Sequence, residues 1–555
     1  MSLTVRYLDV PQGAQQAMMV AGEGQPFSDP AEVSAGVADA SYATLELGQW
    51  PLDGSRCLLP DEPAQVGWWS EALSDEQGNF TEPPTLTVSF PEPFTATGLT
   101  FTFSPSTSQW CSAVRVTWLN GQTQLAQTIA YPDSPRWVLE QKVESFDTIR
   151  IELLATNQPQ NFAKLQQLTV GQTILFDKEE LIAVRQVNEA DPMLCVLTVD
   201  TMTVEIRDRA GRSLAPQENQ RMELYRDDAL LAVQYISKSG REAQQYYSFS
   251  CQSAIGLLGD EFLGGLFVDM PVEELLAEIL DGATYELDAS FAGLTVTGYL
   301  PVCTRREALQ QLAFAIGALV TTYASHAICL RPIPEAIAHT FAPGEIFTGA
   351  KVETAPRKAR IEVTAHGYTP STEAEMLLDE ESISGEDLLL TFDAPHYDYT
   401  IVGGTITASG ANWVRVTANG TVTLTGKPYI HSTMLHTKRD PQATAAERNN
   451  VLTVDSATLV NSGNVSQVLE RLYAAAQLRQ TLTQDAVIKA HRAGQRVSSV
   501  NPWGTLTRGF ITAMDSTLTQ NGHTASITIS GVEVEAEGVY IYAGELYAGG
   551  KEVLY

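Results

Sequence analysis

Short runs of alternating apolar and polar residues are the feature that most constrains this chain. In the N-terminal third, apolar side chains occupy every second position of four segments: residues 86–90, 99–103, 114–118 and 149–153. A period of two places those side chains on one face of a β-strand. Turn residues lie between segments, at Pro91-Glu92-Pro93 and Asn120-Gly121. We therefore expect residues 1–175 to form a β-sandwich.

The order of these segments resembles the discoidin, or galactose-binding-like, jelly roll. The resemblance is carried by LTVSF (86–90), GLTFTF (98–103), VRVTWLNG (114–121) and DTIRIELLAT (147–156). The long early loops of that family are matched by GWWSEALSDEQGNF (67–80). Such domains bind ligands at loops on one end, where aromatic faces stack on sugar rings. The resemblance thus implies five ligand-binding candidates: Trp50, Trp68, Trp69, Phe80 and Trp110. The alternative is that Trp68 or Trp69 fills the bottom of the core.

Residues 176–340 are predicted to form several strands followed by two helices. Strand patterns cover 196–206, 222–225, 231–236 and 246–251. Pro271 suits the first position of a helix, and the capping-box pair Thr304 and Glu307 marks the start of a second helix.

The second half of the chain is again predicted to be mostly β. Residues 341–445 form a β-rich domain, in which the acidic stretch 367–387 is expected to be a solvated loop and Asn419-Gly420 a tight turn. Residues 446–535 give one helix and a final barrel. The apolar stripe of this helix is Leu469, Leu472, Tyr473 and Ala476, and a strand, a turn at Asn521-Gly522 and a strand cover 509–531. The fold class is therefore mainly β and multidomain.

The order of segments from about residue 180 to 532 resembles the hub and tail-tip proteins of phage-type tails. The resemblance is carried by SFSCQSAIGLLGDEFLGGLF (248–267), TGYLPVCTRREALQQLAFAIGALV (297–320) and residues 511–518. It implies a homotrimer whose two barrels per chain present six docking surfaces to a sixfold tail tube. The implied partners are tail-tube, distal-tail or baseplate proteins and the tape-measure protein. The implied location is the virion tail, assembled in the bacterial host cytoplasm.

The C-terminal segment 536–555 repeats Tyr-Ala-Gly at 542–544 and 547–549. Alternation of this kind suits a docking tail that adds to a neighbour's sheet edge. A ragged terminus is the alternative.

The formal net charge of −31 excludes the basic face that wrapping nucleic acid or lying on an anionic membrane requires. An acidic lumen would still let DNA pass without sticking. We expect no sequence-specific nucleic-acid binding and no stable membrane insertion, because no apolar run reaches roughly 18 residues. We expect no secretion signal, because the first residues, MSLTVRYLDVPQG, contain no basic region followed by an apolar stretch.

No nucleophile, nucleotide or zinc motif stands out, so we expect no enzymatic activity, no cofactor and no metal. Asp393, His396 and Asp398 form a polar cluster that is more typical of a turn than of a metal site. The six cysteines are expected to be reduced, mostly buried thiols. Two other functions stay open: a carbohydrate-binding adhesin and, less favoured because no acidic pair stands out and we expect no further domain, a cell-wall hydrolase.

Overall fold

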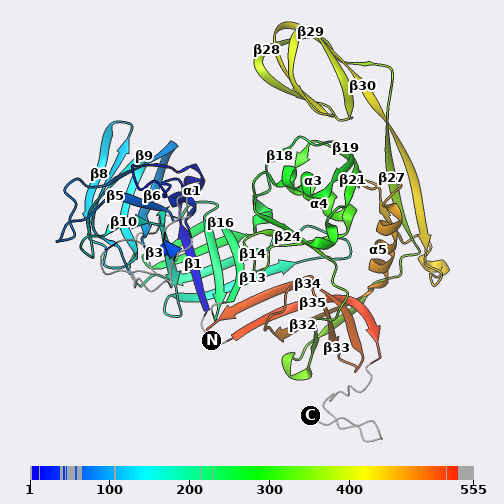
Figure 1. Cartoon of the computed structure of the whole chain (residues 1–555). Helices are drawn as coiled ribbons and strands as arrows, with labels where there is room; N and C mark the ends of the chain where they lie inside the picture. The colour runs from blue at the N-terminus through cyan, green and yellow to red at the C-terminus, as the bar shows by residue number, and fades with distance from the viewer. Residues whose placement is uncertain are drawn as a thin grey trace, which may run out of the picture.

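The computed structural model describes residues 3–11, 13–37, 42–43, 46, 57–58, 66–104, 108–209, 211–212, 214, 216–227, 229–520 and 522–535. The fold is mainly β and has several sheets, as the sequence predicted. Figure 1 shows a sandwich, two adjoining barrel halves, a small α/β module and a long arm. Within the described residues, no helix is both long and apolar enough to span a membrane.

The central element is a thirteen-stranded sheet that forms both barrel halves. Its strands, in spatial order, are β12 (Gln172–Phe176), β1 (Leu3–Asp9), β15 (Arg221–Arg226), β16 (Ala229–Ala243), β17 (Tyr246–Gln252), β14 (Thr201–Arg207), β13 (Leu181–Glu189), β34 (Leu506–Thr519), β35 (Gly522–Val534), β32 (Gln480–Val487) and β26 (Lys351–Thr354), with β33 (Arg496–Val500) beside β34 and β25 (His339–Phe341) beside β33. Each half has its own apolar core. Tyr7, Phe176 and Phe249 lie in the first, and Phe341 and Ile527 lie in the second.

The two barrel halves are joined by one strand pair, β13 with β34. The antiparallel register runs from Val184 opposite Leu518 to Glu189 opposite Ala513. The sequence pattern missed β13 because its inward positions include Gln186 and Asn188, which are polar yet 3% exposed. We call this pair the seam.

The sandwich is a separate, well-filled unit. Its larger sheet contains β11 (Gln167–Val170), β6 (Thr85–Thr102), β9 (Arg136–Thr156), β7 (Cys111–Asn120) and β8 (Thr123–Ala130), with β2 (Met19–Ala21) beside β6. Two smaller sheets pair β10 (Phe162–Leu165) with β5 (Trp68–Leu73) and β3 (Tyr42–Ala43) with β4 (Cys57–Leu58). The two short helices are α1 (Ala14–Ala17) and α2 (Glu32–Ala35). Trp118 and Phe146 meet edge to face in its core at 4.7 Å. The predicted turn at Asn120-Gly121 is confirmed, since β7 ends and β8 begins there.

The turn predicted at Pro91-Glu92-Pro93 is wrong. These residues lie inside the single long strand β6, where the register with β9 shifts between Ser89 and Phe94. Both prolines fall among the extra residues of this bulge, so their missing N–H groups cost no ladder hydrogen bond.

The chain begins in the barrel rather than in the sandwich, although residues 1–175 were predicted as one sandwich. β1 pairs with β15 and with β12, so the sandwich is an insertion between the adjacent strands β1 and β12. At this junction the buried Asp9 carboxylate accepts hydrogen bonds from Thr97 Oγ1 (2.5 Å) and Gln220 Nε2 (3.0 Å). Thr97 belongs to the sandwich, so this network ties the two units together.

The α/β module covers one end of the first barrel. It contains the helices α3 (Val272–Leu280) and α4 (Arg305–Ile316), the 3-10 turns η1 (Ala254–Leu257) and η2 (Ala289–Phe291), and the strands β18 (Glu261–Phe262), β19 (Gly265–Pro271), β20 (Tyr285–Leu287), β21 (Thr295–Leu300), β22 (Cys303–Thr304), β23 (Ala318–Thr321) and β24 (Ile328–Pro332). The capping box of Thr304 and Glu307 is confirmed at the start of α4. Pro271 lies one position before α3 as its N-cap, not inside the helix.

The arm projects beyond the α/β module (Figure 1) and consists of β27 (Arg360–Pro370), β28 (Glu375–Thr391), β29 (His396–Ser409), β30 (Trp413–Arg439) and β31 (Val451–Val454). Two predictions are wrong here. The acidic stretch 367–387 belongs largely to strands, because the half-buried Leu377 and Leu378 pack inward while the carboxylates face solvent. Asn419 and Gly420 lie within β30, where they pair with β28 and make no turn.

Helix α5 (Val465–Gln477) packs against the base of the arm, and its predicted apolar stripe is confirmed. Leu472 is fully buried there, and Leu469, Tyr473 and Ala476 are half-buried. Two further 3-10 turns are η3 (Pro343–Glu345) and η4 (Ala445–Glu447). The predicted strand, turn and strand at 509–531 correspond to β34 and β35, although Asn521 lies outside the described residues. The segment 536–555 lies outside them as well.

The five cysteines whose side chains are described form no disulfide, and four of them are buried. Burial raises the pKa of the Cys195 and Cys303 thiols to about 11. These groups stay protonated near neutral pH. The prediction of mostly buried thiols is confirmed for the described cysteines.

Candidate functional site: the seam groove

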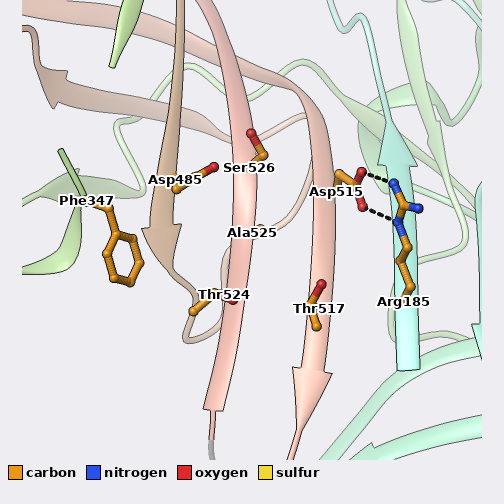
Figure 2. Close-up of a pocket in the computed structure, with 8 residues that line it drawn as sticks. All are labelled: Arg185, Phe347, Asp485, Asp515, Thr517, Thr524, Ala525 and Ser526. Carbon is orange, nitrogen blue, oxygen red and sulfur yellow. Dashed lines mark hydrogen bonds and ion pairs between the residues drawn. The ribbon is translucent and has the colours of Figure 1, made fainter. Parts of the chain in front are cut away.

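An open hollow of about 580 Å³ lies across the seam between the two barrel halves. Its lining comes from β13, β34, β35, β32 and the second residue after η3: Arg185, Phe347, Asp485, Asp515, Thr517, Thr524, Ala525 and Ser526. We call it the seam groove. Figure 2 shows Phe347 on one side and the Arg185–Asp515 pair on the other, with strands β32 and β35 between them.

The charged wall of the groove is a two-pronged ion pair that bridges the seam. Arg185 donates from Nε to Asp515 Oδ1 (2.9 Å) and from Nη2 to Oδ2 (2.5 Å). The hydrogen bonds from Arg185 lower the pKa of Asp515, so the carboxylate stays charged at neutral pH. Both side chains are well exposed, 65% and 40%, so the pair adds little stability and is accessible to a partner.

The opposite wall is apolar. Phe347 is 48% exposed, and its backbone N–H donates to the Asp485 carbonyl (2.9 Å), which fixes this segment against β32. Threonine and serine side chains lie between the two walls. Such a lining can bind a protein surface by hydrogen bonds and one aromatic contact, but it holds no histidine or cysteine that could act as base or nucleophile.

The sequence did not point to this groove. Its residues come from segments up to 341 positions apart, between Arg185 and Ser526. Asp515 and Thr517 belong to the segment 511–518 that carries the resemblance to tail proteins, but no motif connects that segment with Arg185 or Phe347. The solvent exposure of Phe347 can be known only from the folded structure, because the sequence around it does not tell which other residues cover its ring.

The predicted aromatic site on the sandwich is not a cluster of exposed rings. Trp68 is fully buried and donates from Nε1 to the Glu23 carbonyl (3.1 Å). Trp69 is 8% exposed and donates to the Val66 carbonyl (3.2 Å). The Trp68 indole lies in the main core of the sandwich, and the Trp69 indole packs in a separate small cluster with Phe27, Val66 and Phe162.

The other three aromatic candidates differ in how far the structure buries or describes them. Phe80 is 8% exposed and belongs to the same core. Trp110 is half-buried and donates from Nε1 to the Pro132 carbonyl (3.1 Å), so one part of its ring reaches the surface. Trp50 lies outside the described residues.

A buried charged cluster that the sequence did not predict lies beside Trp69. Lys164 Nζ is 2.5 Å from Glu46 Oε2 and 2.6 Å from Gln109 Oε1, and it lies 4.2 Å from the centre of the Trp69 ring. The Lys164 and Glu46 side chains are 2% and 0% exposed. A pair so enclosed fixes the local structure and cannot meet a ligand directly.

The polar residues at 393–398 make separate local contacts, two hydrogen bonds and one ion pair. His396 Nε2 lies 2.6 Å from Glu375 Oε1, and Asp398 pairs with Lys427 at 2.5 Å. Asp393 contributes its backbone carbonyl to the Tyr299 hydroxyl (3.1 Å). In the part of the chain that the structure describes, no three ligand-type side chains are grouped to hold a metal ion.

Comparison with known proteins gives likenesses of fold but none of sequence family. No family model matches the sequence, and no curated protein matches it. The structure is similar to the tail protein from Neisseria meningitidis MC58, with a TM-score of 0.41 and 12% identity over 65% of this chain and 93% of that chain. It is also similar to a chain of the phage P2 baseplate, with a TM-score of 0.26 and 8% identity over 67% and 93%.

A third likeness covers a smaller part of the chain. The family 32 carbohydrate-binding module of NanJ from C. perfringens, solved with galactose, matches with a TM-score of 0.19 and 11% identity over 31% of this chain and 99% of that chain. The matches to tail proteins thus cover about two thirds of the chain, and the match to the carbohydrate-binding module covers about one third. At such low TM-scores and identities the likenesses carry no conclusion about function, which has to rest on this chain's own residues.

Proposed function

We propose that this chain is a structural hub or tip protein of a phage-type tail, which joins the tail tube to the baseplate or tip and acts as a homotrimer. The observation that carries the proposal is the seam. Two barrel halves formed by distant parts of the chain share one hydrogen-bonded sheet across β13 and β34.

A shared sheet holds the two barrels at a fixed spacing and orientation, because the strand ladder cannot hinge without breaking hydrogen bonds. Each chain therefore offers two rigid docking faces, and three chains around an axis offer six. Such a ring suits the end of a sixfold tube. The seam groove lies between the two faces, where Arg185, Asp515 and Phe347 are available to a tail-tube or distal-tail protein.

The charge of the chain fits a conduit. With a formal net charge of −31, a ring of three copies repels the phosphates of DNA, so DNA or a tape-measure protein would pass without sticking. The role is structural and non-enzymatic, in a virion tail assembled in the host cytoplasm.

The sandwich has a second role in this proposal, in baseplate contacts or glycan binding. It is attached to the barrel through the neighbouring strands β1 and β12, which leaves most of its surface free for another partner. Among the four aromatic candidates that the structure describes, Trp110 is half-buried and the other three are buried, which supports Trp110 as the contact for a sugar.

The test is the native mass of the full chain at micromolar concentration, measured by light scattering and native mass spectrometry. A mass near three times 60.3 kDa supports the hub. A chain that stays monomeric even when mixed with tube and distal-tail proteins contradicts it.

The seam groove is tested in the same tail-assembly mixture. Phe347→Ala should lower incorporation into tails, while Trp503→Ala, which changes another exposed aromatic residue of the second barrel, should not. Equal incorporation of both variants would remove the groove from the interface.

The adhesin alternative predicts a different pair of results. A monomeric full chain that binds glycans, and loses that binding in Trp110→Ala but not in Trp503→Ala, would favour it over the hub.

A further inference from the structure

A second hollow, of about 250 Å³, lies where the two barrel halves meet helix α5 and the base of the arm. We call it the junction groove. Its apolar lining comes from segments far apart in the sequence and includes Leu194, Pro356, Leu452, Leu478 and Phe510. A smaller cavity of about 150 Å³ accommodates a benzene ring, so this groove has room for one aromatic side chain.

The rim of the junction groove is basic in a strongly acidic chain. Lys358 and Arg479 lie there, with Asp191 as the one acidic residue of the lining. Lys358 Nζ donates to the Asn450 side-chain oxygen (2.9 Å), and Arg479 Nε donates to the Ala355 carbonyl (2.9 Å). Asp191 accepts a hydrogen bond from the Leu194 backbone N–H (3.0 Å). The lining therefore carries a net charge of about +1 and favours an acidic, aromatic partner.

The segment 536–555 of this chain begins close to the groove. Strand β35 contributes Ser530 to the lining and ends at Val534. Four residues of strand span about 13 Å. Tyr540 follows Val534 by six residues, which reach about 20 Å when extended. The segment can therefore turn back to the groove without any movement of the barrels.

The chemistry of the segment matches the groove. Its first fifteen residues, AEGVYIYAGELYAGG (536–550), bring Tyr540, Tyr542 and Tyr547 as aromatic groups together with Glu537 and Glu545. A tyrosine ring would fill the apolar hollow with its hydroxyl at the rim. The carboxylates would then lie near Lys358 and Arg479.

We propose that residues 536–555 fold back into the junction groove of their own chain and strap the two barrels to α5 and the base of the arm. The reach and the charge favour this site over the neighbour's sheet edge expected from the sequence. Docking of residues 536–555 within their own chain requires neither a homotrimer nor a phage-type tail. The proposal therefore does not depend on the function proposed above.

The first experiment uses the full chain and fills the groove. Ala475 lines the groove, whereas its neighbour Ala474 is exposed on the same helix. Ala475→Phe should expel the segment, and chymotrypsin should then cut at Tyr540 to Tyr547 about tenfold faster than in the unaltered chain. That factor corresponds to the loss of roughly 1.4 kcal/mol of docking free energy. Ala474→Phe should leave the rate unchanged. Equal cleavage rates in all three proteins would overturn the proposal.

The second experiment does not depend on whether Ala475→Phe folds normally. Amide exchange is compared between the full chain and a chain ending at residue 535. Removal of the segment should speed exchange in peptides 191–194, 355–358 and 475–479, and a synthetic peptide of residues 536–555 should restore the slow rate. A peptide with Tyr540→Ser and Tyr542→Ser should fail to do so. Unchanged exchange on truncation, or protection that grows with protein concentration and so comes from a second copy, would overturn docking within one chain.

Discussion

Thr97→Val tests the junction between the sandwich and the first barrel. The substitution keeps the shape of the side chain but removes the hydroxyl that donates to Asp9 Oδ2 at 2.5 Å. Both residues are buried, Thr97 at 8% and Asp9 at 3% exposure. A hydrogen bond to a charged group contributes about 1.5–3 kcal/mol, so we expect a loss of that size in the free energy that closes this junction.

The loss should depend on pH. Burial raises the pKa of the Asp9 carboxyl above its ordinary value, and the hydrogen bonds from Thr97, Gln220 and Tyr7 oppose that rise. A raised folded-state pKa means that the contribution of Asp9 to stability is fully present below the ordinary Asp pKa and is lost as pH rises through the folded pKa. Without the Thr97 bond the folded pKa rises further. The loss caused by Thr97→Val should therefore be larger near about pH 8 than near about pH 4.

The assay is native-state amide exchange of peptides 3–9 and 172–176, which cover β1 and β12. It reports local opening and needs no assumption that the whole chain unfolds in one step. At the higher pH, Thr97→Val should speed exchange about 10- to 100-fold, relative to unfolded-peptide rates at the same pH. Thr97→Ser keeps the hydroxyl and should stay close to the unaltered chain. A Thr97→Val effect that is equal at both pH values, or equal to that of Thr97→Ser, would refute the reasoning.

Three further predictions concern other parts of the fold. Phe249→Ala removes a fully buried ring whose centre lies 5.8 Å from that of Tyr7. In urea titrations it should lower the unfolding free energy of the first barrel by about 3–5 kcal/mol. A change below about 1 kcal/mol would show that neighbouring side chains move in to fill the space of the ring. Burial raises the pKa of Asp200 to about 6, so its contribution to stability should fall as pH rises from about 4 to about 6, and Asp200→Asn should flatten that part of the stability–pH curve. Gly298 has φ +153°, and an added Cβ would lie 2.6 Å from the Thr458 carbonyl oxygen, so Gly298→Ala should lower the melting temperature, whereas Gly344→Ala, with open space around it, should not.

The sequence by itself determined most of the local structure. Alternation predicted the strands of the sandwich around Leu86 and Val114, and the capping box predicted the start of α4 at Thr304. The apolar stripe around Leu472 likewise predicted α5. These predictions succeed because the period of the apolar residues and the identity of a cap depend on neighbours within a few positions along the chain.

Local signals failed where distant partners changed their meaning. Pro91 and Gly420 normally favour turns. Pro91 instead lies in a bulge of β6 that is flanked by residues paired with β9, and Gly420 pairs directly with β28, so the chain stays extended through both positions. The aromatic rings of Trp68 and Trp69 were placed in binding loops, yet the surrounding sandwich encloses them. Neither result can be read from the adjacent residues, because strand pairing and burial depend on what lies across the sheet.

The tertiary structure alone decided how the parts are connected and where a partner can bind. It placed β1 beside β12, so that the sandwich became an insertion, and it paired β13 with β34 across more than 300 residues. The seam groove exists only because of that second pairing. A strand's sequence fixes which side chains share a face, but its hydrogen-bonding edges are the same backbone groups in every strand, so the choice of partner comes from packing of the whole chain.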